Sequence, residues 1–332
     1  MKKRLLSICT AAMLILTLAA CGTPADKGTS GSGTNADTGA IKYTVGILQQ
    51  LEHPALDAAT EGFKEALTEK LGDSVKFDEA NAQNDMNNCT TIANKFVSDG
   101  VDLIMANATT ALQAAAAATD KIPVVGTSIT DYNSAGVLKG TVEKPGGNVT
   151  GASDLAPLDQ QAELFTELLP NVKKVGILYC SSEPNSKFQA DKMEELLNAK
   201  QIEVKIFTVA DSNEIQNVLT AAVEEIEALY IPTDNTIADN TELIKNITLN
   251  AKIPVITGEE NQCKVCGLAT LSISYKDMGY SAGLVAADIL QGKANPADTA
   301  IVYSKEVTKL FNPEIAKQLG IEIPEGIKAI GE

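Results

Sequence analysis

The sequence has few of the residues that catalytic and metal sites use. It contains one histidine, His53, and no tryptophan, and aromatic residues make up only 4% of its 332 residues. Metal sites built from several histidines are therefore excluded, and a Ser-His-Asp arrangement would have to use His53. We expect neither a metal nor a cofactor, and we do not predict an enzyme.

Positive charge is also scarce, since 27 basic residues face 43 acidic ones and the formal net charge is −16. An acidic protein repels phosphate backbones, so we expect no nucleic-acid partner. Hydrophobic residues make up 44% and charged residues 21% of the chain, which is ordinary globular composition and excludes a disordered chain or a polytopic membrane protein. The length predicts about two domains.

The N-terminus has the pattern of a secretion signal. Lys2, Lys3 and Arg4 precede an uncharged apolar run over residues 5–20, which is short for about 30 Å of hydrocarbon. The run ends in Leu-Ala-Ala-Cys, which resembles a bacterial lipobox, with Cys21 as the lipidated residue. The alternatives are cleavage elsewhere and a structural role for Cys21. Residues 21–40 predict a flexible tether. We expect an extracytoplasmic protein anchored to the cell membrane by lipid at Cys21.

Strand and helix patterns alternate from residue 41 onward. Apolar runs typical of parallel strands lie at 43–50, 75–79, 101–106 and 122–127, and again at 173–180, 203–209, 227–232 and 253–259. Helical patterns lie at 55–70, 85–99, 111–119, 159–169, 187–199, 212–226 and 238–250. A strand at 268–274, a helix at 276–291, a strand at 300–307 and a helix at 313–319 complete the chain.

The repeated order predicts an α/β fold with two doubly wound parallel-sheet domains joined by a multi-strand hinge. We expect an N-terminal lobe of residues 41–152 plus about 274–299. The C-terminal lobe is expected to contain residues 153–273 plus about 300–332.

Polar residues follow the predicted strands. Open parallel sheets bind ligands beyond the carboxyl ends of their strands, and two facing sheets form a cleft there. The candidate ligand-binding residues of the first half are Glu52, His53, Thr109, Thr110, Thr127, Ser128 and Asp131. Those of the second half are Ser181, Ser182, Asn185, Ser186, Asp234, Asn235 and Glu259.

Four segments carry a resemblance to one family. They are residues 52–54 (EHP), 144–151 (KPGGNVTG), 182–186 (SEPNS) and 234–238 (DNTIA). From about residue 41 to 324 the chain is similar to the ABC transporter substrate-binding lipoproteins that include tryptophan- and tyrosine-binding proteins. The resemblance implies a type I periplasmic binding protein fold that closes like a Venus flytrap. It also implies a monomer that delivers an amino acid, often aromatic, to a membrane permease and its ATPase.

An amino-acid ligand needs partners for its carboxylate and its ammonium group. Hydroxyl and backbone N–H groups at residues 181–186 suit a carboxylate near a helix start, with ordinary capping as the alternative. Thr109 and Thr110 would add donors from the first half. Asp234 is the candidate partner of the ammonium group, again with capping as the alternative.

Other residues have less defined roles. Glu259 and Asp131 are rival anions for the ammonium group, and the alternative role for Glu52 is a solvated loop charge. His53 either contacts the ligand or makes a structural hydrogen bond. Tyr132, Tyr179 and Phe188 are possible stacking partners for an aromatic ring, although Phe188 has the spacing of a core residue.

Cys263 and Cys266 lie in a predicted loop. A zinc site would need further ligands that the sequence lacks, and a disulfide between these residues or to Cys180 stays open, so we assign them no function.

Two other functions also stay open. One is the same receptor class for another amino acid, a nucleoside or a sugar, although the absence of tryptophan argues against sugars. The other is an extracytoplasmic hydrolase, which is disfavoured because residues 126–130 (GTSIT) lack the second glycine of a nucleophile elbow.

Overall fold

The computed structural model describes residues 40–304 and 306–331. The predicted signal segment, the lipidation site Cys21 and the tether up to residue 39 lie outside these residues. Among the helices that the described residues form, none has both the length and the apolar character needed to cross a membrane.

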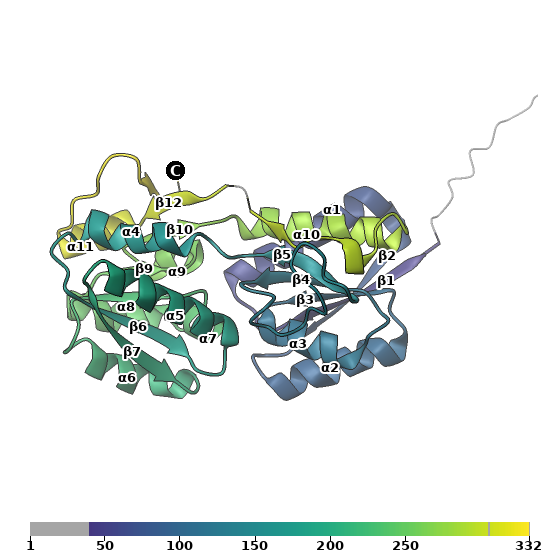
Figure 1. The fold of residues 1–332 in the computed structure, drawn as a ribbon, viewed down its shortest axis with the longest axis horizontal. Helices are drawn as coiled ribbons and strands as arrows, with labels where there is room; N and C mark the ends of the chain where they lie inside the picture. The colour runs from purple at the N-terminus through teal and green to yellow at the C-terminus, as the bar shows by residue number, and fades with distance from the viewer. Residues whose placement is uncertain (1–39, 305, 332) are drawn as a thin grey trace, which may run out of the picture. The chain divides into compact units, whose positions relative to one another are not determined.

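A six-stranded parallel sheet forms the first half. Its strands are β1 (Tyr43–Gln49), β2 (Val75–Asn81), β3 (Leu103–Asn107), β4 (Val124–Ile129), β5 (Val149–Ser153) and β11 (Val302–Tyr303), in the order β11-β5-β4-β3-β1-β2. Helices α1 (Pro54–Leu71) and α10 (Tyr275–Leu290) cover one face (Figure 1). Helices α2 (Met86–Asp99) and α3 (Thr109–Ala118) cover the other. We call this sheet with its helices the first lobe.

A seven-stranded sheet forms the second half. Its strands are β6 (Lys174–Cys180), β7 (Glu203–Val209), β8 (Ala228–Ile231), β9 (Val255–Thr257), β10 (Ala269–Ser272), β12 (Thr308–Phe311) and β13 (Lys328–Ala329). The order is β13-β12-β10-β9-β8-β6-β7, and only the β10–β12 pair is antiparallel.

Helices cover both faces of this sheet as well. Helices α4 (Leu158–Leu168), α5 (Pro184–Ala199) and α11 (Pro313–Leu319) pack on one face, and α6 (Ile215–Ala222) and α8 (Thr241–Asn250) pack on the other. The short helices α7 (Asn235–Ala238) and α9 (Glu260–Val265) follow β8 and β9. Three single 3-10 turns lie at Gly72–Ser74, Ser212–Glu214 and Pro296–Asp298. We call this sheet with its helices the second lobe.

The central strands are apolar on both sides because helices cover both faces. In β6, Val175, Ile177 and Tyr179 join the core under α4 and α5, whereas Leu178 and Cys180 join the core under α6 and α8. Alternate residues of a strand point to opposite faces, so a strand buried on both sides has an unbroken apolar sequence. This is the pattern from which the sequence predicted parallel strands.

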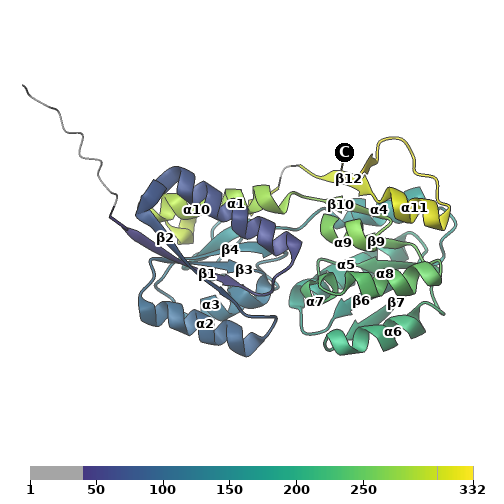
Figure 2. The same cartoon turned by 180° about the vertical axis from the view of Figure 1, so that it is seen from behind.

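The chain passes between the two sheets three times (Figure 2). It does so from β5 to α4, from β10 to α10, and from β11 to β12. The predicted fold class, two doubly wound sheets joined by several connections, is confirmed.

Several local predictions were wrong. Strand β5 was not predicted, because its sequence VTGAS has little apolar character although all five residues are buried. The predicted helix at 212–226 is a 3-10 turn followed by α6. Helices α7 and α9 are too short to show a helical period, and the helix expected from residue 238 starts at Thr241.

The predicted strand at 300–307 is two strands in different sheets. Val302 and Tyr303 pair with β5, so the first sheet continues past the expected limit near residue 299, and β12 starts at Thr308 in the second sheet. Cys263 lies in α9 and Cys266 ends that helix, rather than both lying in a loop.

Candidate functional site

A small cavity lies where the carboxyl ends of the two sheets meet. Its lining residues come from both lobes: His53, Leu56, Ser128, Asp154, Asn185, Thr233, Asp234, Asn235, Ala238, Glu259, Gln262 and Tyr275. The cavity volume is about 20 Å³. One water-sized group needs about 10–15 Å³, whereas pockets for whole small molecules usually measure about 300–1,000 Å³. A larger ligand therefore requires the lobes to separate.

Side chains of the two lobes contact each other directly around this cavity. The hydrogen-bonded pairs are His53 Nε2 with Asn235 Oδ1 (3.2 Å), Asn84 Nδ2 with Thr236 Oγ1 (2.9 Å), and the hydroxyls of Thr130 and Thr233 (3.1 Å). Gln189 of α5 also donates to Thr130, at 3.4 Å. We call the space between these contacts the cleft.

The only histidine is placed in the cleft by Pro54, which starts α1 directly after it. Asn235 Oδ1 can only accept, so His53 Nε2 is the donor in the bond between them. Burial lowers the pKa of His53, and the bond to Asn235 and the nearby carboxylates oppose this. The structure thus gives His53 an interlobe hydrogen bond that it donates from Nε2, and the lowered pKa favours the neutral imidazole.

Glu183 is a buried carboxylate that the sequence analysis did not select. Its two oxygens accept from the backbone N–H and side-chain amide of Asn235 (3.0 and 2.7 Å) and from the N–H and hydroxyl of Thr236 (both 2.8 Å). Glu183 therefore holds the N-terminus of α7, whose residues contact His53 and Asn84 across the cleft.

Asp234 has the capping role that was the alternative in the sequence analysis. Its carboxylate accepts from the backbone N–H groups of Cys180 (2.7 Å) and Ile237 (2.8 Å). Burial raises the pKa of Asp234, and the charge of Glu183 raises it further. Asp234 lines the cavity, but both of its oxygens are already used as acceptors.

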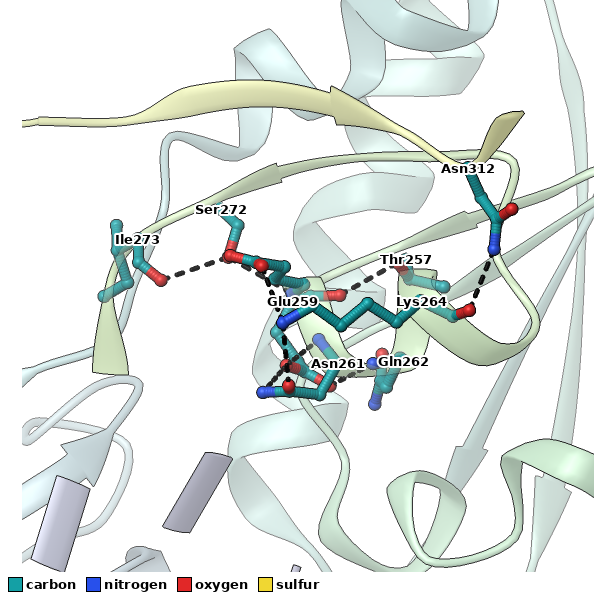
Figure 3. A network of polar contacts seen from close by, with 9 residues as sticks. Thr257, Glu259, Asn261, Gln262, Lys264, Ser272, Ile273 and Asn312 are labelled. Atoms are coloured by element: carbon teal, nitrogen blue, oxygen red, sulfur yellow. Dashed lines mark hydrogen bonds and ion pairs between the residues drawn. The ribbon is translucent and has the colours of Figure 1, made fainter. Parts of the chain in front are cut away.

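Glu259 is the N-cap of α9 (Figure 3). Its carboxylate accepts from the backbone N–H groups of Asn261 and Gln262 and from the Asn261 side chain. Burial raises the pKa of Glu259 to about 7, against the opposing effect of these hydrogen bonds.

The raised pKa of Glu259 predicts a pH-dependent stability. The unfolded chain loses this proton near pH 4.5 and the folded protein only near 7, so the contribution of Glu259 is full at low pH and is lost as the pH rises through that window. Between pH 5 and 8, the stability of the wild type relative to Glu259→Gln should fall by about 2 kcal/mol. Urea unfolding of both proteins measures this difference in stability. The effects of the other titratable groups cancel in it, because the two proteins share them. A difference that stays constant would contradict the prediction.

Asp154 and Tyr275 are cavity residues that the sequence analysis missed. The Tyr275 hydroxyl donates to Asp154 Oδ2 at 2.9 Å, and the Asp154 backbone N–H donates to Ile129 at the end of β4. Asp154 directly follows β5, and Tyr275 is the first residue of α10, so this hydrogen bond joins two of the three connections between the lobes. Burial raises the pKa of Asp154, and Tyr275 and, more weakly, Thr130 oppose the rise.

The structure brings together six of the predicted ligand-binding residues: His53, Ser128, Asn185, Asp234, Asn235 and Glu259. Ser128 stands at an irregular end of β4 with a φ of 57°, which turns its hydroxyl to Asn107 Oδ1 at 2.7 Å. The other eight do not line the cavity: Glu52, Thr109, Thr110, Thr127, Asp131, Ser181, Ser182 and Ser186.

The eight residues outside the cavity have other surroundings. Thr109 and Thr110 are buried in the first turn of α3, where the Thr110 N–H donates to Gln50. Asp131 caps a turn by accepting from the Ser134 N–H, and Ser181 and Ser182 are exposed. Tyr132 and Tyr179, considered for ring stacking, are buried in the cores of the two lobes.

Glu52 lines a different and wider feature. A groove of about 990 Å³ runs along α1 and the edge strand β2 on the first lobe, and further carboxylates, among them Asp57 and Glu61, line it. Its acidic groups are solvated or paired, as Glu61 is with Lys276 at 3.1 Å. Unlike this groove, the smaller cavity combines buried polar groups from both lobes, so it is the candidate site.

The described cysteines offer no reactive thiol. Cys89, Cys180, Cys263 and Cys266 are free and buried, and burial raises the pKa of each thiol. Within residues 40–304 and 306–331, no group of three or more His, Cys, Asp and Glu side chains is arranged to hold a metal ion.

Comparison with known sequences decides the family. Residues 44–331 match the sequence profile described as ABC transporter substrate binding protein. The chain belongs to this family. Its members bind solutes and are not enzymes. The similarity to solved substrate-binding proteins shows that the chain has the type I periplasmic binding protein fold.

Proteins of similar sequence or structure align with most of the length of this substrate-binding protein. The tyrosine-binding protein of Clostridioides difficile strain R20291 is 38% identical over 96% of this chain and 93% of its own length. A Streptococcus pneumoniae ABC domain in complex with L-Trp has a TM-score of 0.84 at 36% identity, covering 87% of this chain and 100% of that one. The ligand-free, open structure of a C. difficile substrate-binding protein with adhesive properties has a TM-score of 0.68 at 38% identity, covering 87% and 99%.

The two solved structures differ in how well they superimpose on this substrate-binding protein, although their sequence identities are nearly equal. The TM-score is higher for the tryptophan complex, 0.84, than for the open structure, 0.68. Hinge motion changes the arrangement of lobes while each lobe keeps its fold. The structure superimposes better on the tryptophan complex than on the open structure, and its own lobes contact each other directly through His53 with Asn235 and Asn84 with Thr236.

Proposed function

We propose that this substrate-binding protein takes up an aromatic amino acid, tyrosine or tryptophan, in the cleft and delivers it to an ABC importer. The observation that carries the proposal is 38% identity over 96% of the chain to a tyrosine-binding protein. The similarity to a structure with bound L-Trp supports the same ligand class. The partners in this proposal are a membrane permease and its ATPase.

The proposed mechanism is closure about the three connections between the lobes. A ligand that touches both lobes binds the closed arrangement better than the open one and so shifts the population toward it. Because the cavity between the lobes measures only about 20 Å³, the contacts of His53 with Asn235 and of Asn84 with Thr236 would open to admit the ligand, and these side chains would then face it. No bond is made or broken.

The proposal includes an extracytoplasmic location. The charged and apolar pattern of residues 1–20 supports export, and Cys21 is the proposed lipid attachment site. A lipid anchor would keep the domain beside the permease, with residues 22–40 as the tether.

Thermal unfolding with a panel of ligands tests the ligand class. The purified protein, unfolded and refolded to remove any carried ligand, should be stabilised by tyrosine or tryptophan. At a hundred times Kd the gain is about 2.7 kcal/mol, or a few degrees in Tm. Leucine, glucose and adenosine serve as controls and should give a smaller shift or none. A shift with only a sugar or nucleoside would overturn the proposed ligand.

A further inference from the structure

Three oxygen atoms at the cavity lack hydrogen-bond partners. Among the described residues, the buried side-chain atoms without a partner are Thr127 Oγ1, Asp154 Oδ1, Asn185 Oδ1 and Gln262 Oε1. Asp154, Asn185 and Gln262 all line the 20 Å³ cavity. An unsatisfied buried polar atom costs about 1–3 kcal/mol, so three at one place need an explanation.

The orientation of each of these side chains is fixed by its other polar atom. Asp154 Oδ2 accepts from the Tyr275 hydroxyl at 2.9 Å. Asn185 Nδ2 donates to the Thr233 carbonyl at 2.9 Å, and Gln262 Nε2 donates to the Pro232 carbonyl at 3.1 Å. Because both amide nitrogens donate to backbone carbonyl groups, the amide oxygens are the atoms that lack a hydrogen-bond partner.

The free atoms form a set of acceptors, and a cation bound among them would favour the ionised form of Asp154, which then gives the set one negative charge. An ammonium group has three N–H donors and one positive charge, and it is about the size of a water molecule. It would satisfy all three oxygens, and Asp154 would balance its charge. A carboxylate has only acceptors and would be repelled. Calcium takes about six to eight oxygen ligands, more than this set supplies.

We propose that Asp154, Asn185 and Gln262 form the subsite for the ligand's primary ammonium group. This inference rests on the proposed function for the rest of the ligand. It replaces Asp234, whose oxygens hold Cys180 and Ile237, as the ammonium partner.

The subsite also joins the two lobes at their connections. The Asp154 N–H is bonded to Ile129 of the first lobe, whereas Asn185 and Gln262 belong to α5 and α9 of the second. An ammonium group bound to all three oxygens therefore contacts both lobes. Asp154 is 5%, Asn185 4% and Gln262 1% exposed, so the group would be shielded from water when the lobes close.

Calorimetry with three related ligands tests the subsite in the refolded full-length protein. The ligands are tyrosine, tyramine (which lacks the carboxylate) and 3-(4-hydroxyphenyl)propionate (which lacks the amine). The wild type should bind tyrosine and, more weakly, tyramine, and it should prefer tyrosine to the deaminated acid by about 100-fold or more. Equal binding of tyrosine and the deaminated acid would overturn the subsite.

Asp154→Asn removes the charge and keeps the shape. It should weaken tyrosine binding about 100-fold and reduce the preference for tyrosine over the deaminated acid to less than tenfold. A general folding defect would weaken both ligands alike, so the loss of preference separates the two causes. Asp159→Asn, an exposed carboxylate in the first turn of α4, is the matched control and should bind tyrosine like the wild type. An unchanged preference in Asp154→Asn would overturn the inference.

If Asp154→Asn does not fold, Gln262→Met gives the same test through a neutral acceptor, with an expected loss of about tenfold for tyrosine and none for the deaminated acid. A wild type that binds no aromatic amino acid but binds another primary amine in an Asp154-dependent way would overturn the proposed function and keep the subsite. A wild type that binds no primary amine would overturn both.

Discussion

Replacing Glu183 by alanine is expected to lower the free energy of unfolding by about 4 kcal/mol. The carboxylate accepts four hydrogen bonds from Asn235 and Thr236, two of them from backbone N–H groups at the start of α7. Glu183 is only 2% exposed, so water reaches these donors poorly once the carboxylate is gone. Urea unfolding followed by circular dichroism measures the change.

A control variant in α5, the helix that begins directly after Glu183, separates this role from the general effect of removing a carboxylate. Glu195 is exposed and pairs with Lys192 at 2.8 Å, so Glu195→Ala should change stability by less than about 0.5 kcal/mol. The loss of stability in Glu183→Gln should lie between those of Glu183→Ala and Glu195→Ala, because the new amide keeps one acceptor oxygen but its nitrogen would face N–H donors. If Glu183→Ala loses no more than Glu195→Ala, the carboxylate does not hold α7.

Glu183→Ala should also weaken the hydrogen bonds between the lobes at the cleft. Asn235 and Thr236, which Glu183 positions, contact His53 and Asn84 of the other lobe. With α7 no longer held, these contacts should weaken, and tyrosine binding should weaken with them. The pKa of Asp234 should also move down toward its usual value, because the charge of Glu183 is one cause of its rise.

The sequence predicted the sheets better than it predicted the site. Strands such as β6 are apolar throughout because both faces are covered, and this signal is local. Strand β5 gave no such signal, since Thr150, Gly151 and Ser153 are buried without being apolar. Without β5, nothing placed Asp154 at a strand end, and the residue was missed.

The predicted residues that line the candidate cavity follow the strand-end rule. His53, Ser128, Asn185 and Asp234 come directly after predicted strands or at the next helix start, so their position could be read from the order of elements. Their roles could not, because a helix cap and a ligand contact require the same residue types.

Partners that are distant in the sequence were beyond prediction. Glu183 precedes Pro184 at a helix start, yet its carboxylate holds α7, 52 residues further along the chain. Asp154 is bonded to Tyr275, 121 residues away. Which buried oxygen stays free depends on such pairings, and only the three-dimensional structure gives them.

Replacing Gly279 by alanine is expected to destabilise the protein by about 3 kcal/mol, although alanine normally favours a helix interior by about 1 kcal/mol over glycine. Gly279 lies in α10 against α1, and a Cβ atom there would stand 2.0 Å from the Ala59 carbonyl oxygen. Backbone atoms cannot rotate away, so the helices would have to separate. Urea unfolding should show the loss, while Ser281→Ala in the same helix should change stability by less than about 0.5 kcal/mol.

The same contact exists in the opposite direction, which allows a sharper test. A Cβ atom at Gly62 of α1 would stand 2.0 Å from the Lys276 carbonyl oxygen of α10. If both glycines are needed for the same close packing of α1 against α10, the first alanine already moves the helices apart. The second alanine then clashes less and costs less free energy of unfolding. The double variant Gly62→Ala/Gly279→Ala should therefore lose at least about 1 kcal/mol less than the sum of the single losses. Additive losses of stability would mean that each substitution acts only at its own position and that the two do not share an effect on the spacing of α1 and α10.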